Sequence, residues 1–249
     1  MKKLFVIIIL FLCCINSFAQ KFDESQRINK GDLTLLDSTI SDLALAKMDN
    51  SQLRILRNMI FAKYGHTFNS DDLKVFFSQF GWYKPGKKVS ESEFTENEKH
   101  LLDSIKIFET RNENSSTIKF GNEIIGLWHE TPVMPDTWCD RFLIYPDQKI
   151  EFLISYFTIN YSDDVDVHEY LGNYEIKGNV LTFVVNKLVK GKETIYLNTP
   201  LIFKFPILPI EEAVFGNGEL IRQMIQIGSK KYYLYSDNPK TIGDWGRQW

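Results

Sequence analysis

Apolar side chains recur at helical spacing in the first half of the chain. Between residues 53 and 64 they form one stripe, made of Leu53, Leu56, Ile60, Phe61 and Tyr64. Asp49 with Gln52 three residues later fits an N-terminal capping box, and Gly65 fits a left-handed C-terminal cap. The pattern therefore predicts a helix that begins near residue 50 and ends at Tyr64.

Two further helices are predicted before residue 110. Asp71 and Asp72 place acids in the first turn of a helix whose inward positions are Leu73, Phe76, Phe77 and Phe80. Thr95 and Glu98 form a second capping box, and the helix that it opens has an apolar face of Leu101, Leu102, Ile105 and Phe108. Between them, residues 81–86 form a turn that carries two large aromatic residues. We expect a compact helical domain over residues 40–111, preceded by a polar arm over residues 20–39.

The hydrophobic rhythm changes after the polar run NENSST at residues 112–117. Beyond a linker at residues 112–120, apolar and polar residues alternate, which is typical of strands. A hairpin is predicted across Gly178-Asn179, with Leu181, Phe183 and Val185 facing inward. About eight strands joined by tight turns over residues 121–249 predict an antiparallel meander, most economically closed into a barrel. The predicted fold class is a multi-domain chain, α and then β.

One basic residue falls inside the apolar stripe of the first helix. Arg57 lies between Leu53 and Ile60 on the helical wheel, and a guanidinium there needs a carboxylate or several carbonyl groups. Glu98, Asp72 and Asp103 are the candidate partners. The alternative is that Arg57 also captures an anionic ligand.

The run LRNMIFAKYGHTF, followed by LKVFF and WYKP, resembles the YARHG domain over residues 40–108. The five signature positions read Phe61-Ala62-Lys63-Tyr64-Gly65, so Tyr64 replaces the signature histidine, and His66 follows. The resemblance implies a small three-helix extracellular bacterial module without an established enzymatic activity. On this basis, and because Trp82 and Tyr83 could stack on a ligand, the candidate ligand-binding residues are Arg57, Asn58, Tyr64, His66, Trp82 and Tyr83.

Gly126-Leu127-Trp128 opens the first predicted strand and resembles the Gly-x-Trp motif of lipocalin-like barrels. The resemblance implies that Gly126 and Trp128 are structural and that the tryptophan closes one end of an eight-stranded barrel. The interior of so short a barrel is either a ligand cavity or filled by its own side chains.

The N-terminus has the pattern of a cleaved signal peptide over residues 1–19. Lys2 and Lys3 precede an apolar run of about 12 residues, too short to span a bilayer, and Ser17-Phe18-Ala19 fits a cleavage site. Cys13 and Cys14 lack the small preceding residues of a lipid anchor, so none is expected. Loss of two lysines takes the net charge from −3 to −5, with no basic cluster for nucleic acid. We expect a periplasmic or extracellular protein without an integral membrane segment.

No motif of an enzyme family is present in the sequence. Cys139, the one cysteine outside the signal peptide, could be a nucleophile only beside His129 or His168, and no spacing favours a metal site or cofactor. The acidic run at Asp163, Asp164 and Asp166 lacks the glycine and glutamate of a calcium loop. The sequence favours a non-catalytic binding protein of the cell envelope. A scaffolding role through protein contacts is the first alternative, and a hydrolase using Cys139 and a histidine is the second.

Overall fold

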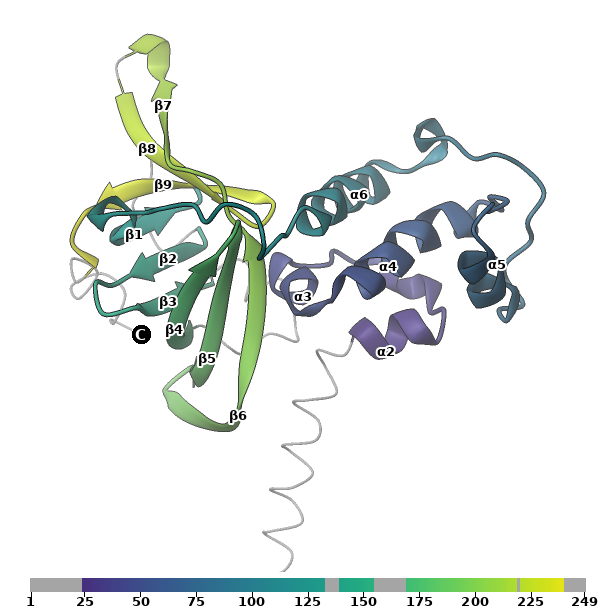
Figure 1. Ribbon diagram of the computed structural model, residues 1–249, viewed down its shortest axis with the longest axis horizontal. Coiled ribbons are helices and arrows are strands. Elements are labelled where there is room, and N and C mark those ends of the chain that lie inside the picture. The colour runs from purple at the N-terminus through teal and green to yellow at the C-terminus, as the bar shows by residue number, and fades with distance from the viewer. Residues whose placement is uncertain (1–23, 133–138, 155–168, 219, 240–249) are drawn as a thin grey trace, which may run out of the picture. The chain divides into compact units, whose positions relative to one another are not determined.

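The computed structural model describes residues 24–132, 139–154, 169–218 and 220–239. The chain divides after Glu109 into two compact units, here named the helical unit and the β unit (Figure 1). The predicted signal peptide, the acidic run at residues 163–166 and His168 lie outside the described residues.

The helical unit consists of helices of 3 to 14 residues joined by turns and loops. In chain order they are α2 (Glu24–Asn29), η1 (Leu33–Asp37), α3 (Asp42–Lys47), α4 (Asn50–Lys63), α5 (Asp71–Ser78), η2 (Glu91–Glu93) and α6 (Glu96–Glu109). Asp49 caps α4 through the predicted capping box with Gln52, so the start of this helix is confirmed. Gly65 ends it with φ +81°, a conformation that glycine adopts without steric cost.

The core of the helical unit lies where α4 packs on α6. Leu53, Leu56 and Ile60 of α4 are buried, as predicted, and α6 contributes the buried side chains Leu101, Leu102, Ile105 and Phe108. The segment before α3 belongs to this core too. Ile28, Leu35 and Leu36 are buried in α2 and η1, although a polar arm was expected over residues 20–39.

In the described residues, the β unit is one antiparallel sheet of nine strands. They are β1 (Gly126–His129), β2 (Arg141–Ile144), β3 (Lys149–Leu153), β4 (Glu169–Lys177), β5 (Val180–Lys190), β6 (Glu193–Pro206), β7 (Glu211–Phe215), β8 (Leu220–Ile227) and β9 (Lys230–Ser236). Their order in the sheet is β6-β5-β4-β3-β2-β1-β9-β8-β7. The short helix η3 (Asn122–Ile124) precedes β1.

One face of this sheet is covered by buried aromatic rings. They come from most of the strands: Trp128, Phe142, Phe152, Tyr170, Phe183, Phe203, Phe205 and Tyr232. Neighbouring rings lie 4.5 to 6.4 Å apart, as in the contacts between Phe142 and Phe152 and between Phe203 and Phe205. Leu181, Phe183 and Val185 of β5 are fully buried, which confirms the predicted inward set.

The sheet corrects the expected eight-stranded closed barrel. It has nine strands in the described residues, and it is open, with β6 and β7 as its edges. Only at one end does β6 meet β8, through the Ile207–Ile227 bridge and the bonds from Leu208 N to Gln226 O and from Gly228 N to Pro206 O. The barrel does not close because the β7–β8 hairpin diverges from the strands before it, so β7 does not pair with β6 (Figure 1).

Candidate ligand-binding site

A buried carboxylate lies between α4 and α6 in the helical unit. Only 1% of the Glu98 side chain is exposed. Its Oε2 accepts hydrogen bonds from Tyr64 Oη at 2.7 Å, Thr95 N at 2.9 Å and Thr95 Oγ1 at 3.0 Å, and its Oε1 accepts one from Lys63 Nζ at 3.0 Å. Four donors therefore compensate the burial of one charge.

Lys63 and Tyr64, at two of the signature positions, thus both bind Glu98. Lys63 supplies the compensating charge and Tyr64 the shortest hydrogen bond. Glu98 was expected as a partner of Arg57, and its bond to Tyr64 was not foreseen. The sequence could have predicted that Glu98 is buried, because it lies on the apolar face of α6. It is three, four and seven residues before Leu101, Leu102 and Ile105.

The network changes the acidity of its members. Burial would raise the pKa of Glu98, but the hydrogen bonds from Tyr64, Thr95 and Lys63 outweigh it and hold the pKa below its usual value. Burial would likewise lower the pKa of Lys63, and the bond to Glu98 raises it above the usual value. Burial, with the bond to Glu98 in support, raises the pKa of Tyr64. All three groups therefore keep the protonation states of an ion pair and a phenol at neutral pH.

Arg57 pairs with a residue that the sequence did not suggest. Its Nε lies 3.0 Å from Glu109 Oε2, and one third of its side chain is exposed, so the guanidinium is half-buried. The candidate partner Asp72 binds Arg54 instead, and Asp103 lies near Lys106. The pairing follows from how α4 crosses α6, which helical spacing alone does not determine. Asn58 is buried, and its Nδ2 donates to Arg54 O at 2.7 Å.

His66 and Tyr83 connect the turns of the helical unit. His66 Nδ1 accepts a hydrogen bond from Val89 N at 3.1 Å, and its ring contacts Phe61 and Phe68 edge-on. Tyr83 is buried, and its Oη donates to His66 O at 2.8 Å. Both side chains are committed to the packing of the loops beside Gly65.

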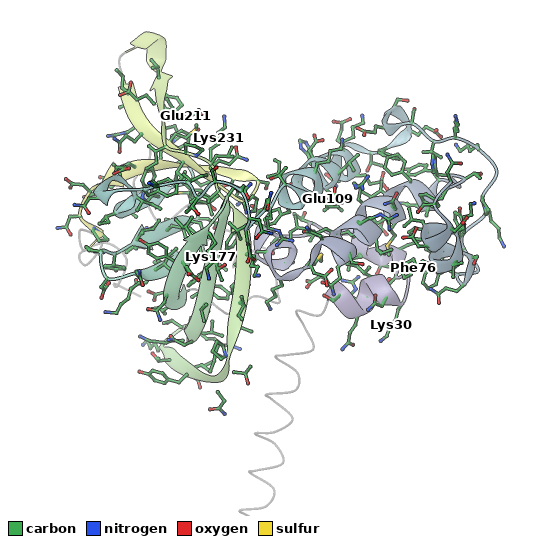
Figure 2. All side chains as sticks on the ribbon, in the orientation of Figure 1. Lys30, Phe76, Glu109, Lys177, Glu211 and Lys231 are labelled. Carbon is green, nitrogen blue, oxygen red and sulfur yellow. The ribbon has the colours of Figure 1, made fainter. Side chains whose placement is uncertain are left out.

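A continuous row of aromatic rings reaches the surface at the end of α5. We name Phe76, Phe80 and Trp82 the aromatic ledge; all three are half-buried (Phe76 is labelled in Figure 2). The Phe76 and Phe80 rings lie 5.4 Å apart, and the Phe80 and Trp82 rings are parallel within 2° at 5.6 Å. Phe76 and Phe80 were expected to face inward, but only Phe77 of this helix turn is fully buried.

The aromatic ledge is held rigidly from below. Phe77 contacts both Phe76 and Trp82, at 5.1 and 6.1 Å between ring centroids. Trp82 Nε1 donates to Gly31 O at 2.9 Å. Gly31 has φ +63°, and a Cβ there would lie 2.7 Å from the Phe80 ring, so Gly31 lets that ring approach the backbone. Rigid, partly exposed aromatic rings are typical of recognition surfaces.

Gly126 and Trp128 of the β unit have structural contacts. Gly126 has φ +147°, and a Cβ there would lie 2.4 Å from Ser236 O on β9. Trp128 is fully buried, and its Nε1 donates to Ile124 O at 2.8 Å in η3. The pair therefore allows close approach of β9 to β1 and fixes the entry to β1.

Charged residues of the β unit gather where β1 ends and where β2 and β9 begin. Lys230 Nζ lies 3.1 Å from both Glu130 Oε1 and Asp140 Oδ2. Burial would lower the pKa of Lys230, but the two carboxylates outweigh it and raise the pKa. Cys139 precedes Asp140 in the sequence, and its side chain is buried. His129 is 2% exposed, and its ring stacks on Tyr235 at 5.0 Å.

In the described residues, no three His, Cys, Asp or Glu side chains converge as metal ligands would.

Within the same described part of the chain, no helix combines the length and the hydrophobicity needed to cross a lipid bilayer.

Comparison with known families gives a match over most of the helical unit. Residues 31–110 match the YARHG domain. The match begins at Gly31, beneath the aromatic ledge, and ends just after α6. No curated protein and no solved structure gives a significant match, and the resemblance of the β unit to lipocalins gains no support.

Proposed function

We propose that this chain is an exported, non-catalytic binding protein of the cell envelope, and that the aromatic ledge of its YARHG domain contacts the ligand. The observation that carries the proposal is the row Phe76-Phe80-Trp82, which is rigid and partly exposed. The other aromatic candidates, Tyr64 and Tyr83, donate their hydroxyl groups to hydrogen bonds within the helical unit.

The chemistry of the aromatic ledge favours a ligand with a flat or apolar face. The partly exposed rings can contact a ligand at little entropic cost, because each ring is already fixed by its neighbours. The face of a sugar ring in a cell-wall glycan has this character, and so has a flat small molecule. The signal-peptide pattern of residues 1–19 supports a location where such polymers occur.

A binding screen tests this proposal. The full chain is titrated by calorimetry with soluble peptidoglycan fragments, other envelope glycans and lipids, and each hit is repeated with Phe76→Ala. We expect the dissociation constant to rise by about tenfold or more, as for loss of one anchoring aromatic side chain. Tyr196→Ala is the matched control, because Tyr196 is an aromatic residue of the β unit with 77% exposure. Equal affinity of Phe76→Ala and the unmodified chain would refute the role of the aromatic ledge.

A scaffolding role is the second candidate, and exposed apolar residues of the β7–β8 hairpin favour it. Val214 and Ile221 are register partners and are 60% and 57% exposed. Paired apolar side chains at a surface often mark a protein contact. This role predicts that the chain binds a protein partner and none of the glycans.

A further inference from the structure

Strands β8 and β9 separate part-way along their length. They pair from Ile227↔Lys230 to Met224↔Tyr233. Beyond that point β8 continues in the hairpin with β7, and β9 continues along β1 (Figure 1). A fork therefore opens between residues 220–223 on one side and residues 234–237 on the other.

The fork encloses a shallow hollow of about 430 Å³. Its lining combines apolar, aromatic and charged side chains: Ile221, Arg222, Gln223, Leu234, Tyr235, Ser236 and Asp237. Ile221 is 57% and Tyr235 is 42% exposed. Arg222 and Asp237 give the two sides of the hollow opposite charges.

The two outer edges of the sheet are protected, whereas the fork is not. On β6, the register is broken around Pro200, and Arg111 Nη1 donates to Lys204 O at 2.9 Å. The edge strand β7 is short and carries the exposed charges Glu211 and Glu212 (Glu211 is labelled in Figure 2). Prolines, bulges and charges are the usual means of preventing a strand edge from pairing. Residues 220–223 have no proline and, in the described residues, no strand beside them in the fork.

We propose that the fork binds an extended peptide segment of another protein, which adds as a strand along residues 220–223 of β8. The peptide would run antiparallel to β8, as β9 does along residues 224–227. Backbone groups of β8 that face the fork would supply the hydrogen bonds, and Ile221 would contact an apolar side chain on one face of the peptide. Arg222 and Asp237 favour a peptide with one charge of each sign or with none. Sugar hydroxyl groups can pair with single backbone groups, but a peptide strand repeats its donors and acceptors at the spacing of β8.

Selection of peptides from a displayed random heptapeptide library on the full chain tests this site. Selected peptides are synthesised and titrated against the unmodified chain, Ile221→Lys and Val214→Lys. We expect Ile221→Lys to weaken binding by about tenfold or more, because it puts a charge where an apolar side chain docks. Val214→Lys is the matched control, since Val214 has the same exposure and lies opposite Ile221 but does not line the hollow.

Two further measurements separate strand addition from other contacts. N-methylation of a bound peptide, one residue at a time, should abolish binding at alternate positions only, because a strand presents every second N–H to each neighbour. Hydrogen exchange should slow at residues 220–223 when the peptide is added. Failure to enrich any peptide, binding that is equal in Ile221→Lys, or an N-methyl pattern without alternation would overturn the proposal. Self-association through the fork without peptide would assign it to a second copy and overturn it too.

Discussion

At the scale of single residues, two of the signature positions form hydrogen bonds to one buried carboxylate. Lys63 and Tyr64 both bind Glu98, which is almost fully enclosed. A signature histidine at position 64 would be a plausible catalyst by residue type alone, but the tyrosine found here donates to a structural carboxylate.

Tyr64→Phe removes one donor from this carboxylate and keeps the ring. We expect the helical unit to lose about 1.5–3 kcal/mol of its free energy of unfolding, because a hydrogen bond to a buried charge is lost. Hydrogen exchange of the α4 amides measures the loss within this unit. An unchanged exchange rate in Tyr64→Phe would contradict the role given to the hydroxyl group.

The same network predicts a dependence on pH. The pKa of Glu98 is lower in the folded state than its usual value of 4.5, so the unfolded state binds the proton first. The stabilisation is therefore complete above about pH 4.5 and is lost as the pH falls through the folded pKa. Denaturation at several pH values should show a steeper acid loss in the unmodified chain than in Glu98→Gln. Parallel curves for the two proteins would refute this assignment.

At the scale of helices and strands, the sequence predicted features set by neighbouring residues better than features set by contacts between distant segments. The capping boxes at Asp49 and Thr95 correctly located the starts of α4 and α6 because they involve residues only three apart. The partner of Arg57 and the opening of the sheet depended instead on contacts between distant segments. The exposure of Phe76 and Phe80 was also missed, because helical spacing distinguishes faces but does not show how far a neighbouring turn covers them.

A substitution at Gly126 tests the close contact between β1 and β9. Gly126→Ala should destabilise the β unit by about 3 kcal/mol or more, since strain at positive φ adds to a clash with Ser236 O. Gly191→Ala is the control, because Gly191 also has positive φ but has nothing within 4 Å of an added Cβ. It should cost only about 1–2 kcal/mol. Equal losses in a urea titration of the two variants would show that the close approach is unimportant.

At the scale of the whole chain, the polar run after α6 is part of the β unit. Asn112 N donates to Asn179 Oδ1 at 2.6 Å, and Asn179 Nδ2 donates to Thr110 O at 3.0 Å. Lys204 pairs with Glu113 at 2.6 Å in the same segment. The composition of residues 112–117 predicted a linker at a domain boundary, and it did not reveal these contacts with the β4–β5 turn.

Asn179→Ala should loosen this segment and lower the stability of the β unit by about 1–2 kcal/mol, through the loss of two side-chain hydrogen bonds. Limited proteolysis should then cut within residues 110–118 faster than in the unmodified chain. Asn173→Ala, at an exposed position of β4, is the control and should leave the cleavage rate unchanged. Unaltered cleavage in Asn179→Ala would contradict the anchoring role.

The most direct test of the central claim compares two variants of the YARHG domain with one ligand from the binding screen. Calorimetric titration measures the dissociation constant, and thermal unfolding measures stability, for Tyr64→Phe and for Phe76→Ala. We expect Tyr64→Phe to lower the melting temperature and leave the dissociation constant unchanged, and Phe76→Ala to raise the dissociation constant by about tenfold. If Tyr64→Phe abolishes binding and Phe76→Ala does not affect it, the signature residues bind the ligand and the aromatic ledge does not.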